Sequence, residues 1–118
     1  HVSLGQTRYI SCLSLVDGVI GNSSSGLLEA PTMKIGTINI GDRQRGRLRA
    51  ASVIDCEPRR REIAESIRKI YTPEFRKVVH ESESPYGPPG ASTKVVNVLR
   101  SIDLHGIIKK EFYSLDIE

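Results

Sequence analysis

Three consecutive serines, Ser23, Ser24 and Ser25, are the first side chains in this chain that could do chemistry. They follow an apolar pair at 19–20 and lead into a segment with helical character, where Gly26 permits close backbone approach. Hydroxyl and backbone N–H groups at a helix N-terminus, with the positive end of the helix dipole, suit an anion and above all a phosphate. Serine is also an ordinary helix-capping residue. Capping alone is therefore the alternative interpretation of this serine turn (residues 22–25).

Two charged residues could extend a phosphate site into a nucleotide site. Glu29 lies about one and a half helical turns after Ser23. Its carboxylate would repel phosphate but can accept two hydrogen bonds from a vicinal diol such as ribose. The alternative is a surface acid that stabilises the positive end of its helix. Arg43 is the first basic residue after the second predicted strand, and its planar guanidinium suits phosphate or sugar oxygens.

The remaining arginines favour simpler interpretations. Arg45, Arg47 and Arg49 alternate after Arg43, and for Arg45 and Arg49 we expect a solvated basic loop. The run at 59–61 opens a predicted helix, where an exposed charged face is expected.

Metal or nucleophilic chemistry has little support in the sequence. His1, His80 and His105 lie at no spacing typical of a metal site or a catalytic triad, and we expect them at the surface. Cys12 and Cys56 lie far apart and form neither a disulfide framework nor a CxxC metal site. A reducing compartment fits best, and the sequence predicts no metal and no cofactor.

Composition describes a soluble globular chain of one domain, or one lobe of something larger. Its 118 residues carry a formal charge of +3, and 17 basic residues are largely offset by 14 acids, so nucleic-acid binding is not implied. No apolar run approaches membrane-spanning length. The chain starts at His1 without Met, which suggests a fragment of a longer protein.

Hydrophobic periodicity and turn residues predict an α/β chain. Pro31 should end or distort the second helix, and Pro58 should stand in the first turn of the third. Tyr9 is most simply a core aromatic of the first helix. A loop is expected at 81–90. The predicted strands are 19–20, 37–40 and 52–55, and the predicted helices are 7–16, 25–33, one from 57 to 71, a short one from 72, and 91–103.

This order favours a mostly parallel sheet with helices on its faces. In such sheets ligands sit at the carboxyl ends of the strands. The serine turn follows the first strand, and a basic, Gly-containing segment, the arginine loop (residues 41–47), follows the second. Both should therefore lie at one edge of the sheet. That coincidence favours phosphate binding over capping.

The two segments 19–31 and 37–47 closely resemble UDP-N-acetylglucosamine 2-epimerases. The likeness covers residues 6–104 and is strongest at 19–56, and the stretch 42–47 resembles the hydrolysing branch. The loop at 85–87 and the helix after it also resemble this family. The chain departs from the family at 88–90, where Pro-Pro-Gly replaces an Asp-Gly pair.

The resemblance implies a Rossmann-like parallel sheet within a glycosyltransferase-B-type fold, in which two lobes hold the nucleotide sugar between them. Residues 1–118 would be a single fragment, the later part of the C-terminal UDP-binding lobe, with 104–118 as a tail. By resemblance, Ser23 and Ser24 hold the UDP diphosphate, Glu29 holds the ribose, Arg43 reaches the sugar side and Tyr9 lies near the uracil. The resemblance assigns no catalytic residue of the family to a position in this fragment.

The implied activity is hydrolysis of UDP-N-acetylglucosamine to N-acetylmannosamine and UDP, by anti-elimination and then hydration, for sialic acid biosynthesis. The resemblance further implies a cytoplasmic homo-oligomer in the full-length form, whose partners are UDP or UDP-N-acetylglucosamine and the missing N-terminal lobe. No nucleic acid or membrane partner is expected. The fragment alone should be inactive.

Three other functions remain open from the sequence. A glycosyltransferase of the same architecture would use the same phosphate and ribose contacts. A non-catalytic basic binding module would act through the arginines at 43–49 and 59–61. The basic residues of the chain are interleaved with acids, however, and few aromatic residues are available for stacking. A purely structural domain would use the serines only as caps.

Overall fold

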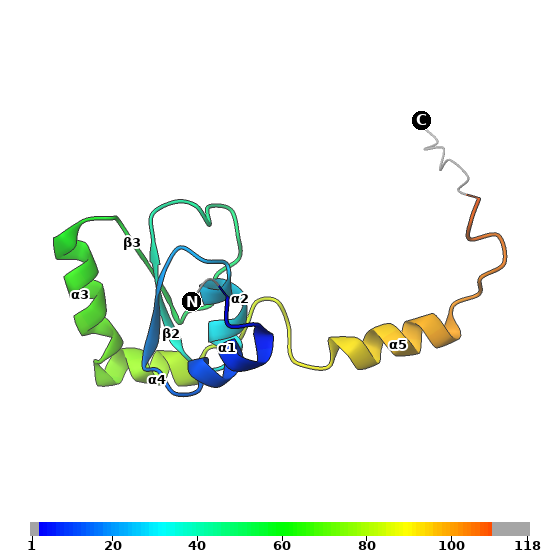
Figure 1. Cartoon of the computed structure of the whole chain (residues 1–118), viewed down its shortest axis with the longest axis horizontal. Helices are drawn as coiled ribbons and strands as arrows, with labels where there is room; N and C mark the ends of the chain where they lie inside the picture. Colours follow the sequence, from blue (N-terminus) through cyan, green and yellow to red (C-terminus); the bar gives the residue numbers. More distant parts are fainter. Residues whose placement is uncertain (1–2, 110–118) are drawn as a thin grey trace, which may run out of the picture. The chain divides into compact units, whose positions relative to one another are not determined.

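The computed structural model describes residues 3–109, which form two units that meet between Pro88 and Pro89. In the described residues the first unit contains a three-stranded sheet and four helices, and the second contains one helix (Figure 1). The elements of the first unit are α1 (Gln6–Leu13), β1 (Gly18–Gly21), α2 (Ser25–Thr32), β2 (Gly36–Ile40), β3 (Val53–Cys56), α3 (Arg60–Ile70) and α4 (Pro73–Glu81); the second unit has α5 (Ala91–Ser101).

The sheet is parallel throughout, with the strand order β1-β2-β3. Ile38 of β2 pairs with Ile20 of β1 on one side and with Ile54 of β3 on the other. Helix α2 connects β1 to β2, whereas the 41–52 segment connects β2 to β3 without a helix. The predicted fold class, a Rossmann-like α/β arrangement with flanking helices, is confirmed. Because the strands are parallel, all three carboxyl ends lie at one edge.

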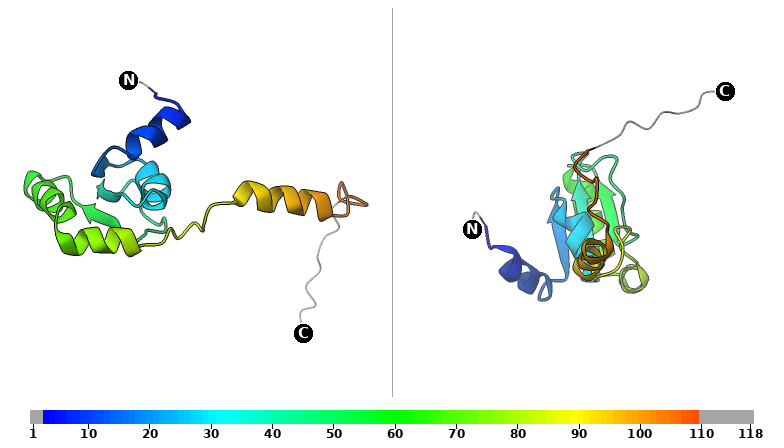
Figure 2. Two further views of the ribbon diagram at one scale, coloured as in Figure 1. Left: turned by 90° about the horizontal axis from the view of Figure 1, so that it is seen from below. Right: turned by 90° about the vertical axis from the view of Figure 1, so that its right-hand side faces the viewer.

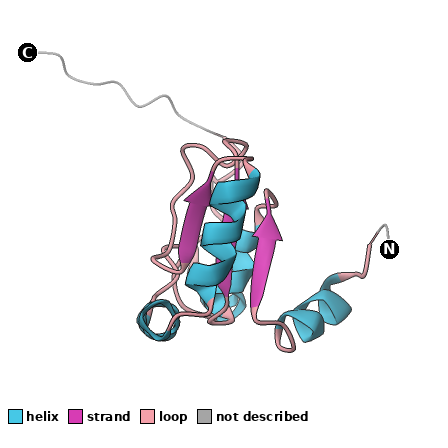
Figure 3. Cartoon of the chain, turned by 90° about the vertical axis from the view of Figure 1, so that its left-hand side faces the viewer, coloured by secondary structure: helices cyan, strands magenta, loops and turns pink. Residues whose placement is uncertain are grey.

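Alternation along β2 directs its side chains to two different helical layers. Ile38 joins a buried cluster with residues of α3 and α4, and an added Cβ at Gly36 would also meet these helices. Thr37 points the other way and contacts Gly26 of α2. Helices α2 and α3 therefore cover opposite faces of the sheet, with α3 lying across one face (Figures 1 and 3).

Two hydrophobic clusters hold the first unit together, one on each face of the sheet. Helix α1 packs beside α2, on the side away from α3 (Figure 2). The first cluster consists of Ile38, Cys56, Ile70, Phe75 and Val79, and the second of Leu13, Ala30 and Ile35 with Tyr9, Val19 and Met33 packed against it. These clusters fix the helices against both faces of the sheet and so fix the loops at its carboxyl edge.

The structure corrects several predicted helix boundaries. Helix α1 stops at Leu13, and Val16 lies beyond it in an exposed turn. Pro31 stands inside α2, one residue before its end. The prediction for Pro58 was wrong, because Arg59 is extended and caps a helix that starts only at Arg60.

Helix α5 has the predicted one-sided apolar pattern but no buried residue. Its side chains Val95, Val98 and Leu99 are between 55% and 66% exposed, and Ile102, just after the helix, is 44% exposed. Most of the predicted tail at 104–118 lies outside the described residues. Within residues 3–109, no helix has the length and apolar character that crossing a membrane requires.

Candidate functional site

The serine turn links the end of β1 to the start of α2. Ser24 occupies the N-cap position of α2, yet its side chain makes no capping hydrogen bond. The N–H groups of Gly26 and Leu27 are bound by the main-chain carbonyls of Ser23 and Ser24, at 3.2 and 2.9 Å. The Ser25 N–H lies 3.4 Å from the Ser23 hydroxyl. The capping interpretation therefore leaves the Ser24 hydroxyl unexplained, and this hydroxyl remains available to a ligand.

Gly26 is needed for packing between α2 and β2. A Cβ at this position would lie 2.6 Å from the methyl group of Thr37, closer than real side chains approach. The Thr37 hydroxyl also donates to the Gly26 carbonyl at 2.8 Å. The absence of a side chain at Gly26 thus serves its packing against Thr37, and the close approach of a ligand to Gly26 stays a prediction. This contact fixes the first turn of α2 against the sheet.

The arginine loop meets the serine turn, as the parallel topology predicted. The Arg43 guanidinium donates to the side-chain oxygen of Asn22 at 3.4 Å, and the Gln44 amide donates to the Asn22 main-chain carbonyl at 2.7 Å. Arg43 and Gln44 of the arginine loop thus bind the side-chain and main-chain oxygens of Asn22 in the serine turn. Arg43 is exposed and lies beside the serines, where its charge can reach an anion.

The expectation of a solvated side chain at Arg49 was wrong. Its guanidinium pairs with the Asp55 carboxylate at 2.8 Å and donates to the main-chain carbonyls of Arg47 and Gln44, at 2.9 and 3.3 Å. Arg45, by contrast, is exposed as predicted. Arg49 was missed because its partner Asp55 belongs to the next strand, and no local pattern links the two residues.

Glu29 lies on α2 beyond its first turn, which contains no acidic residue. The helix-dipole interpretation is therefore weak for this side chain, since that effect fades within the first turn. Glu29 is half-buried, and one of its carboxylate oxygens is fully buried without a hydrogen-bond partner among the described residues. A buried acceptor without a partner is costly, and a ligand hydroxyl would satisfy it.

Tyr9 is a core aromatic residue, as predicted, and it also reaches the serine turn. Its ring is half-buried against the cluster of Leu13, Ala30 and Ile35. Its hydroxyl forms a short hydrogen bond with the Ser25 hydroxyl. Helix α1 is thereby attached to the start of α2, and a part of the Tyr9 side chain lies beside the serines.

Sequence reasoning missed three polar residues that support the site, namely Gln44, Asn39 and Asp55. Gln44 is only 4% exposed, and Asn39 is 1% exposed. The Asn39 amide donates to the Asp55 carboxylate at 2.7 Å. The signal available in the sequence was weak: Gln44 is the one uncharged polar residue between Asp42 and Arg47, and Asn39 stands between two isoleucines of a predicted strand.

The other charged candidates lie on exposed surfaces. Arg59 and Arg61 pair with acids one turn further along α3, at 3.0 and 2.9 Å, which confirms the predicted charged face. The hydrogen bond and charge of Glu65 raise the pKa of Arg61. His80 and His105 are exposed, and His1 lies outside the described residues. Residues 3–109 contain no group of three His, Cys, Asp or Glu side chains that could hold a metal.

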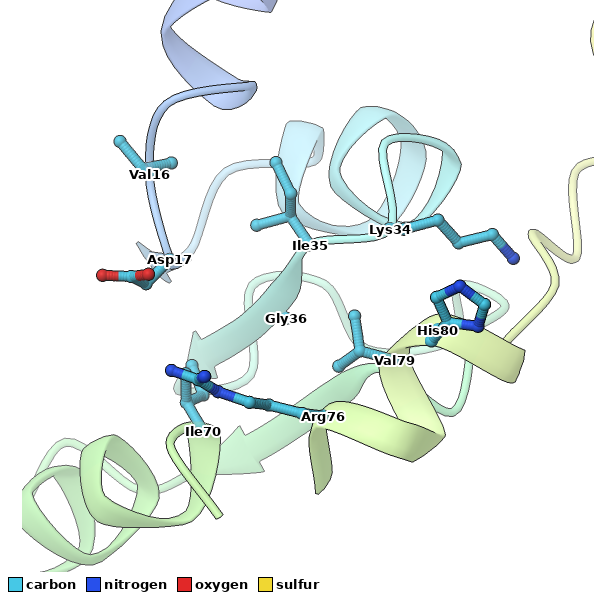
Figure 4. A pocket seen from close by; sticks show the side chains of 9 residues that line it. All are labelled: Val16, Asp17, Lys34, Ile35, Gly36, Ile70, Arg76, Val79 and His80. Carbon is cyan, nitrogen blue, oxygen red and sulfur yellow. The ribbon is translucent and has the colours of Figure 1, made fainter. Parts of the chain in front are cut away.

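A cavity of about 230 Å³ lies at the opposite end of the sheet (Figure 4). Its lining includes Asp17, just before β1, and Lys34 and Gly36 at the start of β2. Helix α4 contributes Arg76 and His80 (Figure 4). The cavity therefore opens at the amino ends of the strands and is separate from the candidate site at the carboxyl ends.

Fold and site together define a class of protein: a Rossmann-like α/β unit whose hydroxyl, carboxylate and guanidinium groups gather at the carboxyl edge, where such sheets hold ligands. The profile of the UDP-N-acetylglucosamine 2-epimerase family matches residues 1–100. The chain therefore belongs to the UDP-N-acetylglucosamine 2-epimerase family, as its sequence resemblance indicated.

Curated relatives support this assignment. The chain is 38% identical over 97% of its length to polysialic acid biosynthesis protein P7 of Escherichia coli. It is 35% identical over 96% of its length to GDP/UDP-N,N′-diacetylbacillosamine 2-epimerase (hydrolyzing) of Campylobacter jejuni. It is 31% identical over 89% of its length to UDP-N,N′-diacetylbacillosamine 2-epimerase (hydrolyzing) of Legionella pneumophila. The chain spans 27% to 29% of the length of these relatives.

Proposed function

We propose that this chain is the UDP-binding part of a hydrolysing UDP-N-acetylglucosamine 2-epimerase, which converts UDP-N-acetylglucosamine and water to N-acetylmannosamine and UDP. The observation that carries the proposal is the meeting of the serine turn and the arginine loop at Asn22, on the carboxyl edge of the sheet, in a chain of this family. Hydroxyls, the main-chain N–H groups of Ser23 and Ser24 just before α2, and a guanidinium at one edge suit a diphosphate.

Each candidate residue has a role in this proposal. Ser23 and Ser24 donate hydrogen bonds to the diphosphate, and the dipole of α2 adds to its stabilisation. Glu29 accepts hydrogen bonds from the ribose hydroxyls, which would satisfy its buried oxygen. Arg43 lies on the sugar side, and Tyr9 lies near the uracil.

The reaction divides between this part and the rest of the protein. A base removes the proton at C2 of the sugar, UDP leaves from C1 in an anti-elimination, and water adds to the resulting glycal. The serine turn and Arg43 stabilise the charge that develops on the leaving diphosphate, an electrostatic role. We assign the proton transfers to groups outside this chain, in the remainder of a two-lobed protein of the glycosyltransferase-B arrangement in which this chain belongs to the C-terminal lobe.

A second substrate calls for a direct test because two relatives are named for it. The Campylobacter relative is named as a 2-epimerase of GDP/UDP-N,N′-diacetylbacillosamine and the Legionella relative as one of UDP-N,N′-diacetylbacillosamine. The Escherichia coli relative, with the higher identity of 38%, is named for polysialic acid biosynthesis. We propose the N-acetylglucosamine derivative as substrate and a sialic-acid-type pathway as its destination. We further propose that the full-length protein is a cytoplasmic homo-oligomer.

The proposed reaction is tested by incubating the full-length protein with each UDP-sugar in D₂O and following the products by NMR. We expect UDP and free N-acetylmannosamine that carries deuterium at C2, because the C2 proton is exchanged during elimination and hydration. A glycosyltransferase would need an acceptor and would retain the original C2 hydrogen. Absence of UDP release from UDP-N-acetylglucosamine, or release with C2 hydrogen retained, would contradict the proposal.

A further inference from the structure

Gln44 is a buried residue within a loop of exposed charges. Its side chain is only 4% exposed, whereas Arg43, Arg45 and Arg47 around it are exposed. Its amide nitrogen donates to the Asn22 main-chain carbonyl at 2.7 Å, a short and well-placed contact across 22 residues of sequence. Burial of a polar side chain in a loop requires such a partner. The partner here belongs to the serine turn.

The contact with the Asn22 carbonyl fixes the orientation of the next peptide group. In a planar trans peptide, the carbonyl of one residue and the N–H of the following residue point in opposite directions. The chain has no cis peptide bond in its described part. When Gln44 binds the Asn22 carbonyl, the Ser23 N–H is therefore directed away from Gln44. No hydrogen bond from the N–H of Ser23 or Ser24 to another main-chain group is present in the described residues.

The main chain of Gln44 is itself fixed by a series of polar contacts that leads to the sheet. The Gln44 main-chain carbonyl accepts from Arg49 at 3.3 Å, and Arg49 pairs with Asp55 at 2.8 Å. Asp55 accepts from Asn39 at 2.7 Å, and Asn39 is fixed in the buried central strand β2. The serine turn is thus connected through Gln44 to the ends of β2 and β3. A rigid support of this kind keeps donors in place before a ligand arrives.

We propose that Gln44 is a positioning residue for the diphosphate site: it sets the peptide between Asn22 and Ser23 so that the main-chain N–H of Ser23 faces the diphosphate. Gln44 does not touch the ligand and acts through Asn22. The inference rests on the proposed function, because it takes the serine turn as the diphosphate site. The inference adds Gln44 to the residues of the site, with a role that depends on its hydrogen bond to Asn22 and on no contact with the ligand.

The test compares UDP with uridine, which lacks the phosphates, on the full-length protein. Gln44→Met keeps the length of the side chain and removes its donor, and Gln44→Asn keeps the amide but is one methylene too short. We expect each variant to weaken UDP binding about tenfold, the loss of roughly one hydrogen bond, and to leave uridine binding unchanged. Calorimetry measures the UDP affinity, and NMR titration measures the uridine affinity.

A matched control and a reference variant separate the outcomes. Gln6→Met makes the same substitution at an exposed glutamine and should leave UDP affinity unchanged. Ser24→Ala should weaken UDP binding if the serine turn is the diphosphate site. If Ser24→Ala weakens binding and both Gln44 variants bind UDP normally, the inference is overturned and the proposed function stands. Equal losses for UDP and uridine would show a merely structural role for Gln44 and would also overturn the inference. A wild-type protein that binds no UDP would contradict both.

Discussion

Glu29 carries the clearest chemical signal of any single residue in this chain. Its carboxylate has one buried oxygen without a partner in the described residues, on a helix turn where the dipole gives little stabilisation. Its residue type and its spacing from Ser23 allow a contact with a vicinal diol, and the family resemblance implies that this diol is the ribose. The sequence does not predict its burial, because burial depends on packing against other elements.

At the residue scale we predict that Glu29→Ala removes discrimination at the ribose. A hydrogen bond to a charged group contributes about 1.5–3 kcal/mol, so UDP affinity should fall about tenfold to a hundredfold. The affinity for 2′-deoxy-UDP should fall much less, because one partner hydroxyl is already absent. Competition binding with both nucleotides measures the difference. Glu65→Ala removes an exposed acid on α3 and serves as control; equal losses for both nucleotides would refute the ribose contact.

The polar residues that support the site, Arg49 and Gln44, could not be predicted from the sequence. Ser23, Ser24 and Arg43 were identified because their types suit phosphate and they follow strands. Arg49 and Gln44 were not, since their partners Asp55 and Asn22 lie on other segments and only the folded chain brings them together. Long-range polar contacts leave no periodic signal in the sequence, in contrast to the apolar faces of helices.

At the scale of elements, the packing of α2 on β2 decides the position of the serine turn. Every strand and helix within residues 3–109 was predicted, because apolar periodicity is local. Their ends were less accurate: α1 is shorter than expected, and α3 starts after Pro58 rather than around it. Helix ends depend on the conformation of single residues, such as the extended Arg59, that periodicity does not encode.

We predict that Gly26→Ala destabilises the protein and that Thr37→Ser relieves the damage. The new Cβ would lie 2.6 Å from the Thr37 methyl group, and such overpacking costs about 1–3 kcal/mol. Serine at 37 removes that methyl group and keeps the hydroxyl that donates to the Gly26 carbonyl. In a double-mutant cycle by urea unfolding, Gly26→Ala should cost less in the Thr37→Ser background. The same cost in both backgrounds would show that this contact does not fix α2.

At the scale of the whole molecule, we propose that this chain binds the leaving group and that residues 3–109 do not supply the base that starts the reaction. It spans 27% to 29% of the length of its curated relatives. The candidate site lies at the carboxyl edge of a sheet of three strands. We propose that a second part of the protein supplies the proton chemistry.

We therefore predict that the isolated 118-residue chain releases no UDP from UDP-N-acetylglucosamine above the buffer rate. The full-length protein, assayed in parallel at equal molar concentration, is the positive control. The assay couples UDP release to a spectrophotometric signal over several hours. Turnover by the isolated chain would show that a complete catalytic set lies within these residues and would refute the division of labour proposed above.

The central claim is that the serine turn binds the diphosphate of UDP, and calorimetric titration of UDP into the full-length protein tests it most directly. The double variant Ser23→Ala, Ser24→Ala should bind UDP at least about tenfold more weakly than the wild type, because two hydroxyl donors to a charged group are lost. Ser14→Ala, which changes an exposed hydroxyl at the end of α1, should bind normally. Unchanged UDP affinity in the double variant, with a normally folded protein, would contradict the claim.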